Sequence, residues 1–134
     1  MTRLIRDRLT PEMADCIDRC NACHEACLEV IDYSLRKGGR QAEPDHIELL
    51  EDCSEICRTA ADFLVRGSPR HALTCSIAAE VSEECAIGCE AWPDDPILSQ
   101  CARICRDCAE SCRGMAFGEL GPDPGEADRI GPEA

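Results

Sequence analysis

Two sets of four cysteines repeat at the same spacing near opposite ends of the sequence. The sets are Cys16, Cys20, Cys23 and Cys27, and Cys101, Cys105, Cys108 and Cys112. Steps of four, three and four residues return to one face of an α-helix, so each set predicts a stripe of thiols about 16 Å long. Thiols bind soft cations such as Cu(I), and they also suit Zn²⁺ and iron–sulfur clusters. The spacing therefore indicates helices that carry metal ligands.

Five further cysteines bring the total to thirteen in 134 residues. They are Cys53, Cys57, Cys75, Cys85 and Cys89. The odd total excludes complete internal pairing, and the helical spacing differs from the loop-rich setting of a disulfide scaffold. We therefore expect free thiols that face a common axis.

Two methionines extend the stripes. Met13 precedes Cys16 by three residues, and Met115 follows Cys112 by three. If the first and last helices are antiparallel neighbours, Cys16 lies level with Cys112, and both thioethers mark one end of a sulfur column. Methionine is a ligand for Cu(I), and a role as a flexible packing residue explains it equally well.

Two of the three histidines are in phase with cysteines. His71 precedes Cys75 by four residues and belongs at the methionine end, whereas His46 precedes Cys53 by seven and belongs at the other end. We treat both as candidate metal ligands. The ordinary alternative for His46 is a solvent-exposed position at a helix start. His24 is rotated by about 100° from the stripe, so we expect it to flank the thiols.

Prolines and glycines mark the elements that must position these side chains. Proline, which is favoured at a first helical position, occurs at Thr10-Pro11, Glu43-Pro44, Ser68-Pro69 and Asp95-Pro96, and the Thr, Ser and Asp that precede it are good N-caps. Helix stops follow at Gly38, Gly67, Pro93 and Gly114. We predict helices over about 11–37, 44–66, 69–91 and 96–116. Short connections make neighbours antiparallel, so the expected fold is an all-α, up-down-up-down four-helix bundle with a thiol-lined core.

The chain is expected to have one folded domain. We divide it into an N-terminal extension (1–10), a cysteine-rich four-helix bundle (11–116) and a disordered acidic tail rich in glycine and proline (117–134).

The composition argues against several classes of function. A net charge of −13 opposes nucleic-acid binding, and no apolar run is long enough to span a membrane. The N-terminus has no apolar signal region, so we expect a cytoplasmic location. The sequence also lacks a Ser/His/Asp set, a phosphate loop and carboxylates paired for acid–base work, so we expect no enzymatic activity.

The number of thiols favours one metal over the others. A structural zinc site needs four ligands, and the ferredoxin run C-x₂-C-x₂-C-x₃-C-P is absent. Cu(I) accepts two or three thiolates, so bridging thiolates can hold a column of ions, on the order of one Cu(I) per cysteine. The alternatives are an iron–sulfur or dithiol redox protein and a zinc or cadmium thiolate sink. Because the helices have caps and apolar flanks, we expect the bundle to fold, with neutral thiols, before metal arrives.

Over about residues 11–116 the chain resembles the bacterial copper storage proteins, which are cysteine-rich four-helix bundles. The resemblance lies in the paired C-x₃-C-x₂-C-x₃-C stripes on the first and last helices, in further cysteines on the middle helices, and in Met and His near the ends. Three in-phase positions, Leu50, Ala78 and Ser82, depart from the pattern because they lack sulfur, which interrupts the expected column at their levels.

The resemblance implies that multiple Cu(I) ions are bound for storage or detoxification, in a homo-oligomer, often a tetramer. It also implies the cytosolic form of the family and a copper chaperone or acceptor as partner. Family members have an open end with Met or His ligands, through which copper enters, and Met13, Met115 and His71 are the counterparts in this chain.

Overall fold

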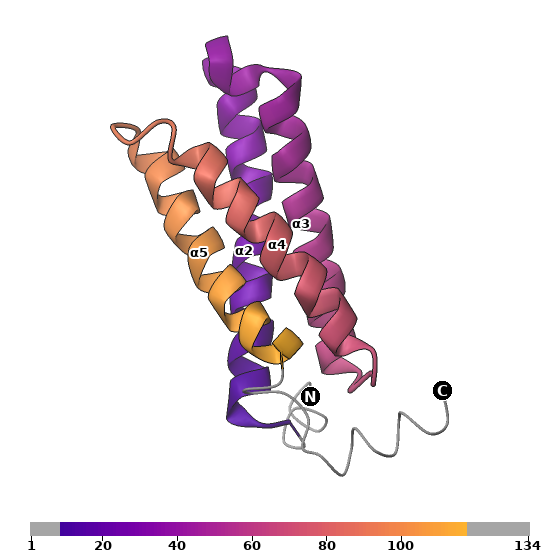
Figure 1. The fold of residues 1–134 in the computed structure, drawn as a ribbon. Coiled ribbons are helices and arrows are strands. Elements are labelled where there is room, and N and C mark those ends of the chain that lie inside the picture. The colour runs from indigo at the N-terminus through magenta and orange to yellow at the C-terminus, as the bar shows by residue number, and fades with distance from the viewer. Residues whose placement is uncertain (1–8, 118–134) are drawn as a thin grey trace.

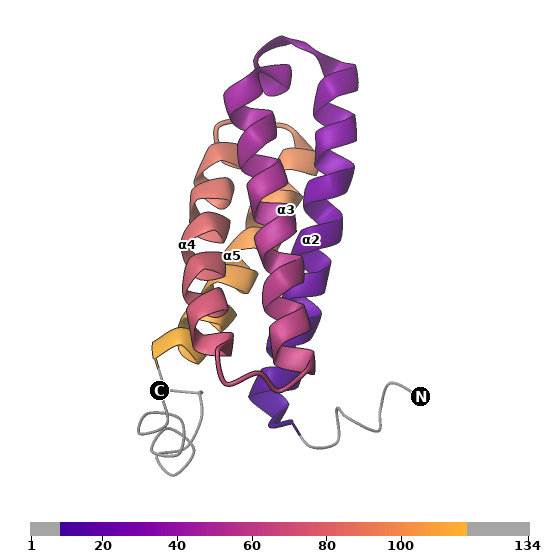
Figure 2. The same ribbon diagram turned by 90° about the vertical axis from the view of Figure 1, so that its right-hand side faces the viewer.

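Four antiparallel helices make up the computed structural model, which describes residues 9–117. They are α2 (Pro11–Lys37), α3 (Pro44–Val65), α4 (His71–Cys89) and α5 (Pro96–Phe117), and they run alternately up and down (Figure 1). Helix α2 packs on α3 and α5, and α4 packs on the same two helices (Figure 2). The predicted all-α four-helix bundle is confirmed, and residues 9–117 contain no strand.

Two of the predicted caps set the start of α2 and α5. The Thr10 hydroxyl accepts a hydrogen bond from the Met13 N–H at 3.1 Å, and Asp95 Oδ1 accepts one from the Ile97 N–H at 3.0 Å. Each satisfies a backbone donor that has no partner within its helix. Because these caps fix where both helices begin, they help to fix the register of the cysteines that follow.

Helix α4 is shorter than the predicted 69–91. Its backbone becomes helical at His71, after a turn in which the Ser68 carbonyl accepts from the His71 N–H at 3.2 Å and the Ser68 hydroxyl accepts from the Arg70 N–H at 3.1 Å. Ser68 and Pro69 thus form a turn before the helix. At the other end α4 finishes at Cys89, because Glu90 to Trp92 already belong to the next turn.

A short 3₁₀-helix, η1 (Gly39–Ala42), lies between α2 and α3 and was not predicted. Gly38 (φ +77°) ends α2, and its N–H bonds to the Ser34 carbonyl at 3.0 Å. The positive φ favours glycine, as the sequence indicated. Helix α3 ends at Val65, one residue before the predicted boundary.

Most of the predicted N-terminal extension and tail lies outside the described residues, which leave out 1–8 and 118–134. Helix α5 continues to Phe117, one residue beyond the predicted end of the bundle. Within 9–117, no helix has both the length and the apolar character that crossing a membrane requires.

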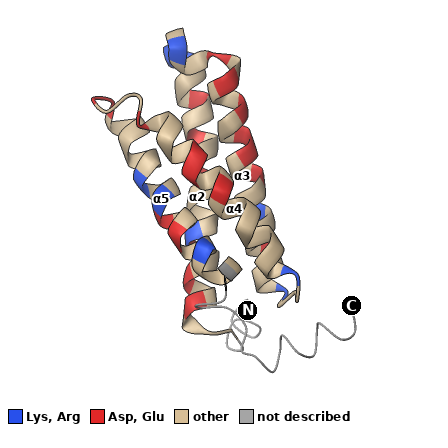
Figure 3. Cartoon of the chain, viewed as in Figure 1, with Lys and Arg blue, Asp and Glu red and all other residues tan. Residues whose placement is uncertain are grey.

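Most charged side chains are exposed or half-buried. Figure 3 shows where the charged residues occur along the helices. Arg106 pairs with Glu90 at 2.6 Å, and Arg113 pairs with Glu83. Such half-exposed pairs contribute little stability each. The interior consists mainly of cysteine, alanine and a few aliphatic side chains, together with a small number of buried polar residues.

Asp95 joins two connections at the end where α2 finishes and α5 begins. Its Oδ2 accepts hydrogen bonds from the Tyr33 hydroxyl at 2.8 Å, from Lys37 Nζ at 3.1 Å and from Gln41 Nε2 at 3.1 Å. The residue is 8% exposed. Burial raises the pKa of its carboxyl, but the hydrogen bonds from Gln41, Tyr33 and Lys37 outweigh burial and hold the pKa below its usual range. This network ties α2, η1 and α5 into one end of the bundle.

Candidate metal centre

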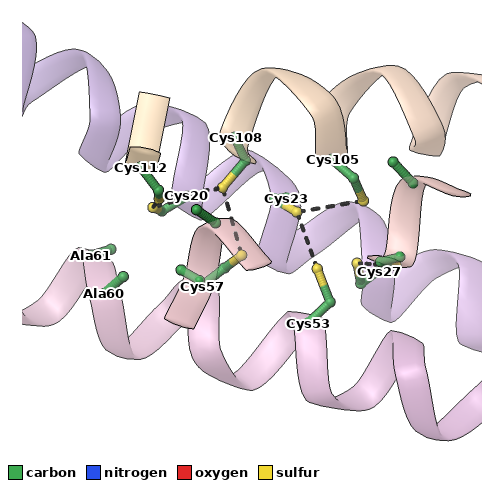
Figure 4. Close-up of a cluster of buried hydrophobic side chains, with 14 of the residues drawn as sticks. Cys20, Cys23, Cys27, Cys53, Cys57, Ala60, Ala61, Cys105, Cys108 and Cys112 are labelled. Carbon is green, nitrogen blue, oxygen red and sulfur yellow. Dashed lines mark hydrogen bonds between the residues drawn. The ribbon is translucent and has the colours of Figure 1, made fainter. Parts of the chain in front are cut away.

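The thiols of α2 and α5 meet in antiparallel register along the axis of the bundle (Figure 4). The sulfur–sulfur distances are 3.8 Å for Cys16–Cys112, 3.8 Å for Cys20–Cys108 and 3.7 Å for Cys23–Cys105. One step further along, Cys101 raises the pKa of Cys27. The predicted register, with Cys16 level with Cys112, is the one observed.

All thirteen cysteines are free and buried. Helix α3 contributes two of them to the column: Cys53 lies 3.6 Å from Cys23, and Cys57 lies 3.6 Å from Cys108, sulfur to sulfur. Metal–sulfur bonds of about 2.3 Å would place two sulfurs of a tetrahedral ion about 3.8 Å apart. The observed separations are therefore close to those that a shared metal ion needs.

The sulfur atoms form four compact groups in which all atoms lie within 4.8 Å of one another. The groups are Cys16–Cys75–Cys112, Cys20–Cys108–Cys112, Cys23–Cys57–Cys108 and Cys23–Cys27–Cys53–Cys105. Each group shares a sulfur with the next, through Cys112, Cys108 and Cys23 in turn. A thiolate that belongs to two groups is placed to bridge two metal ions.

Three cysteines lie beyond these groups, namely Cys85, Cys89 and Cys101. Cys85 is 4.0 Å from Cys27, and Cys101 is 4.0 Å from Cys105, sulfur to sulfur. The column of thiols therefore continues past the fourth group, with looser spacing, toward the end where Asp95 lies.

The three in-phase positions without sulfur do not separate the groups. Leu50, Ala78 and Ser82 are all fully buried, and Leu50 and Ala78 fill space in the core. The expected interruption of the column is thus absent between the first and fourth groups, because α2, α3 and α5 supply sulfur at the levels where α4 does not. The Ser82 hydroxyl touches three thiols, a contact that the sequence pattern did not predict.

His71 lies at the end of the column that begins with Cys16 and Cys75. It is 3% exposed, and its Nδ1 is 2.9 Å from the Ser68 carbonyl oxygen. That contact requires the proton on Nδ1, which leaves a lone pair on Nε2. Nε2 is buried and has no hydrogen-bond partner among residues 9–117. An imidazole held in this way is oriented as metal-binding histidines usually are.

The two methionines end the column at the same level. Met115, one turn beyond Cys112, is 1% exposed, and Met13, one turn before Cys16, is half-buried. Because α2 and α5 are antiparallel, both thioethers lie at the end that holds His71.

His46 lies at the opposite end. Its ring packs against Trp92 with centroids 4.9 Å apart, and its buried Nε2 has no hydrogen-bond partner within the described part of the chain. Burial lowers the pKa of His46, and the nearby Cys101 opposes this shift. His24 flanks the column as expected, with Nδ1 2.9 Å from the Ser54 hydroxyl oxygen.

Hydrogen bonds between neighbouring thiols shift their pKa values in opposite directions. Hydrogen bonding from Cys112 holds the pKa of the Cys16 thiol below its usual range, although burial opposes the shift. Hydrogen bonds to Cys108 and Cys16, aided by burial, raise the pKa of Cys112. Near the far end, hydrogen bonding from Cys105 lowers the pKa of Cys85 to about 6. A thiol ionises more readily where neighbouring thiols donate hydrogen bonds to its sulfur, and the thiols that donate these bonds hold their protons more tightly.

Known proteins are similar to this chain in sequence and in fold. A family model described as copper storage protein matches residues 9–117. The uncharacterized cysteine-rich protein YhjQ of Bacillus subtilis (strain 168) is 31% identical over 101 residues, which are 75% of this chain and 93% of the relative.

Two solved structures are similar in fold. The Nmul_A1745 protein from Nitrosospira multiformis has 39% identity and a TM-score of 0.74, over 78% of this chain and 94% of that one. The structure described as Cu(I)-bound copper storage protein BsCsp3 has 30% identity and a TM-score of 0.73, over 78% of this chain and 98% of that one.

Proposed function

Because this chain belongs to the copper storage protein family, we propose that it binds and stores many Cu(I) ions through its core thiolates, for copper storage or detoxification. The relative with a Cu(I)-bound structure supports the choice of metal. The chemistry agrees, because cysteine thiolates are soft ligands that select Cu(I) over the harder divalent cations.

The observation that carries this proposal is the sharing of sulfur atoms between successive groups. Cys112, Cys108 and Cys23 each belong to two groups. Since Cu(I) needs only two or three thiolates, a shared sulfur links one ion to the next. An isolated structural zinc site needs no such sharing, because four ligands of its own complete its coordination.

We assign the ligands as follows. The thirteen cysteines hold the ions, and Met13, Met115 and His71 form the entrance through which copper reaches the column. Ions then move inward by exchange between neighbouring thiolates. His46 stands at the far end as a candidate terminal ligand.

The family and the ligand set support a binding protein without catalytic activity. We further propose that the protein works in the cytoplasm as a homo-oligomer, with the tetramer that the family resemblance implies, and that a copper chaperone or acceptor exchanges ions with it. Copper would be cargo, taken up and later released.

A zinc or cadmium thiolate sink is the second candidate. The group Cys23–Cys27–Cys53–Cys105 favours it, because four sulfurs within 4.8 Å of one another match the ligand number of a tetrahedral zinc site. An iron–sulfur centre or a dithiol couple is the remaining alternative, and nothing in the arrangement favours it over copper.

Anaerobic titration of the fully reduced protein with Cu(I) tests the proposed function. We expect the thiolate-to-copper ultraviolet absorption to rise until about one Cu(I) per cysteine is bound, because bridging lets each thiolate serve two ions. Saturation with Zn²⁺ near one ion per four cysteines, with Cu(I) binding no further than that, would instead identify a zinc sink.

A further inference from the structure

Helix α4 carries no sulfur over the middle of the column. Cys75 belongs to the first group, whereas Cys85 and Cys89 lie at the far end. Between them, Ala78 and Ser82 are fully buried on the same face of the helix. Within the continuous column, we call the side of this stretch that holds Cys75 the entrance half, and the side that holds Cys85 and Cys89 the deep half.

The Ser82 hydroxyl contacts sulfurs of two successive groups. Its Oγ lies 3.3 Å from Cys57 Sγ and 3.8 Å from Cys108 Sγ, and both of these belong to the third group. It also lies 3.6 Å from Cys53 Sγ, which belongs to the fourth group. The hydroxyl therefore stands where an ion would pass from one half of the column to the other.

Two other buried serines show that this placement is particular to Ser82. Ser34 Oγ bonds to the Gln41 side-chain oxygen at 3.3 Å, and Ser54 Oγ bonds to the His24 carbonyl oxygen at 3.2 Å. Both serines are buried, at 0% and 1% exposure. Their hydroxyls donate to oxygen atoms, whereas the Ser82 hydroxyl contacts sulfur atoms. Ser54 is thus a matched control for a buried hydroxyl outside the sulfur column.

A single hydroxyl has one proton to donate, and it can rotate to suit its surroundings. When a Cu(I) ion leaves a thiolate, that sulfur is left with a buried negative charge, which is costly unless it is paired or hydrogen-bonded. A hydrogen bond to an ionised acceptor is about twice as strong as one between neutral groups. A hydroxyl within reach of three thiolates can lower this cost for each of them in turn.

We propose that Ser82 is a relay residue for copper transfer between the two halves of the column. As an ion moves from Cys57 and Cys108 toward Cys53 and Cys23, one Cu–S bond breaks while the next forms. The Ser82 hydroxyl turns to donate to the sulfur that has lost its ion. Copper remains Cu(I), and Ser82 keeps its proton. This inference rests on the proposed function, and it makes Ser82 a positioning residue with no copper ligand role.

The chain contains a built-in reporter for the deep half. Trp92 is the single tryptophan, it follows Cys89 by three residues, and it packs against His46. Its fluorescence reports copper that reaches the far end, whereas thiolate-to-copper absorption reports copper anywhere in the column. The delay between the two signals measures transfer past Ser82.

The test is anaerobic stopped-flow loading of the reduced, full-length protein with Cu(I), followed by both signals, for the wild type, Ser82→Ala, Ser82→Thr and Ser54→Ala. We expect Ser82→Ala to lengthen the delay at least about tenfold with unchanged final capacity, because one hydrogen bond to a charged group is lost in the transfer step. Ser82→Thr, which retains the hydroxyl, should restore the delay to within about threefold of the wild type. Ser54→Ala should not change it.

A wild type without any delay, or a Ser82→Ala variant with the wild-type delay, would overturn the relay role. So would a slow Ser82→Thr variant with wild-type circular dichroism. These results differ from failure of the proposed function, in which the wild type itself would bind only a few Cu(I) ions at saturation.

Discussion

Each thiol in this core has neighbours close enough to share a proton or a metal ion. Cys112, for example, lies 3.8 Å from Cys16, 3.4 Å from Cys20 and 4.0 Å from Cys108, sulfur to sulfur. In the metal-free protein these contacts are weak hydrogen bonds that raise some thiol pKa values and lower others. We propose that bound Cu(I) replaces the thiol protons and that the same sulfurs then bridge neighbouring ions.

The proposed entrance role of Met13, Met115 and His71 can be tested by substitution. Replacing Met13 and Met115 with Leu and His71 with Gln removes the proposed entrance ligands from one end of the column while keeping apolar packing at the methionine positions. We expect the initial rate of Cu(I) loading from a soluble donor complex to fall about tenfold or more. A loss of about 1.4 kcal/mol in the free energy with which the entrance binds the incoming ion corresponds to a tenfold change. The final capacity should fall by much less, because the thirteen cysteines remain.

His46→Gln is the matched control, because it removes an imidazole from the opposite end. It should leave the initial loading rate unchanged. A large loss of capacity in the triple variant with a normal rate would place the entrance elsewhere, as would slow loading in the control.

The sequence was sufficient to predict the thiol stripes and the pairing of Cys16 with Cys112, because helical periodicity and antiparallel packing together determine both. It also placed His24 beside the column. It did not predict the contacts of Ser82, which appeared only as a position without sulfur. Those contacts depend on side-chain distances between three helices, and such distances do not follow from the spacing within any one of them.

At the scale of elements, the ends of the helices determine whether the stripes meet. Thr10 and Asp95 cap the first and last helices. Asp95 also receives hydrogen bonds from Tyr33 and Gln41, so the start of α5 is tied to the end of α2 and to η1. A shift of one residue in the register of either helix would rotate its thiols by about 100° away from the axis.

Asp95→Ala tests whether the Asp95 hydrogen bonds stabilise the ends of the helices, by urea unfolding of the reduced, metal-free protein. The same experiment shows whether the bundle folds without copper. We expect a loss of about 1–3 kcal/mol at pH 7, because the N-cap and three further hydrogen bonds disappear. Asp94→Ala, an exposed neighbour, should change the free energy of unfolding by no more than about 0.5 kcal/mol.

The pH dependence of the Asp95 contribution follows from the direction of its pKa shift. The folded-state pKa lies below the unfolded value of about 3.9, so the stabilisation is fully present above that value and is lost as the pH falls through the folded pKa. The wild type and the variant should therefore converge in stability in strong acid. A difference that persisted there would show that Asp95 acts through something other than its charge.

The elements themselves were largely predictable, since proline and glycine mark helix ends by a direct steric effect. The start of α4 was placed two residues too early because Pro69 is equally compatible with the turn that Ser68 forms. The network of Asp95 was not predicted, because it joins side chains that are far apart in sequence and meet only where two connections cover the same end of the bundle.

At the scale of the whole molecule, the bundle separates its charges from its metal ligands. The acidic residues that give the chain its net charge of −13 lie mainly on the outside, and the thiols lie on the axis. Each Cu(I) that binds replaces a thiol proton, so the interior gains metal without gaining net charge. This exchange allows a small core to hold many cations without the repulsion that they would otherwise exert on one another.

The overall fold was predictable because four helix starts, four stops and short connections leave few other arrangements. The continuity of the sulfur column was not. The missing sulfur at Ala78 and Ser82 suggested a break, but α2, α3 and α5 supply sulfur at these levels and keep the column continuous.

The most direct test is a crystal structure of the anaerobically Cu(I)-loaded protein with anomalous scattering measured at the copper edge. It should contain a row of copper ions along the bundle axis, from the group Cys16–Cys75–Cys112 to Cys89 and Cys101, with neighbouring ions joined by shared thiolates. Copper confined to the surface or to a single four-sulfur site, with the remaining thiols unoccupied, would contradict the account.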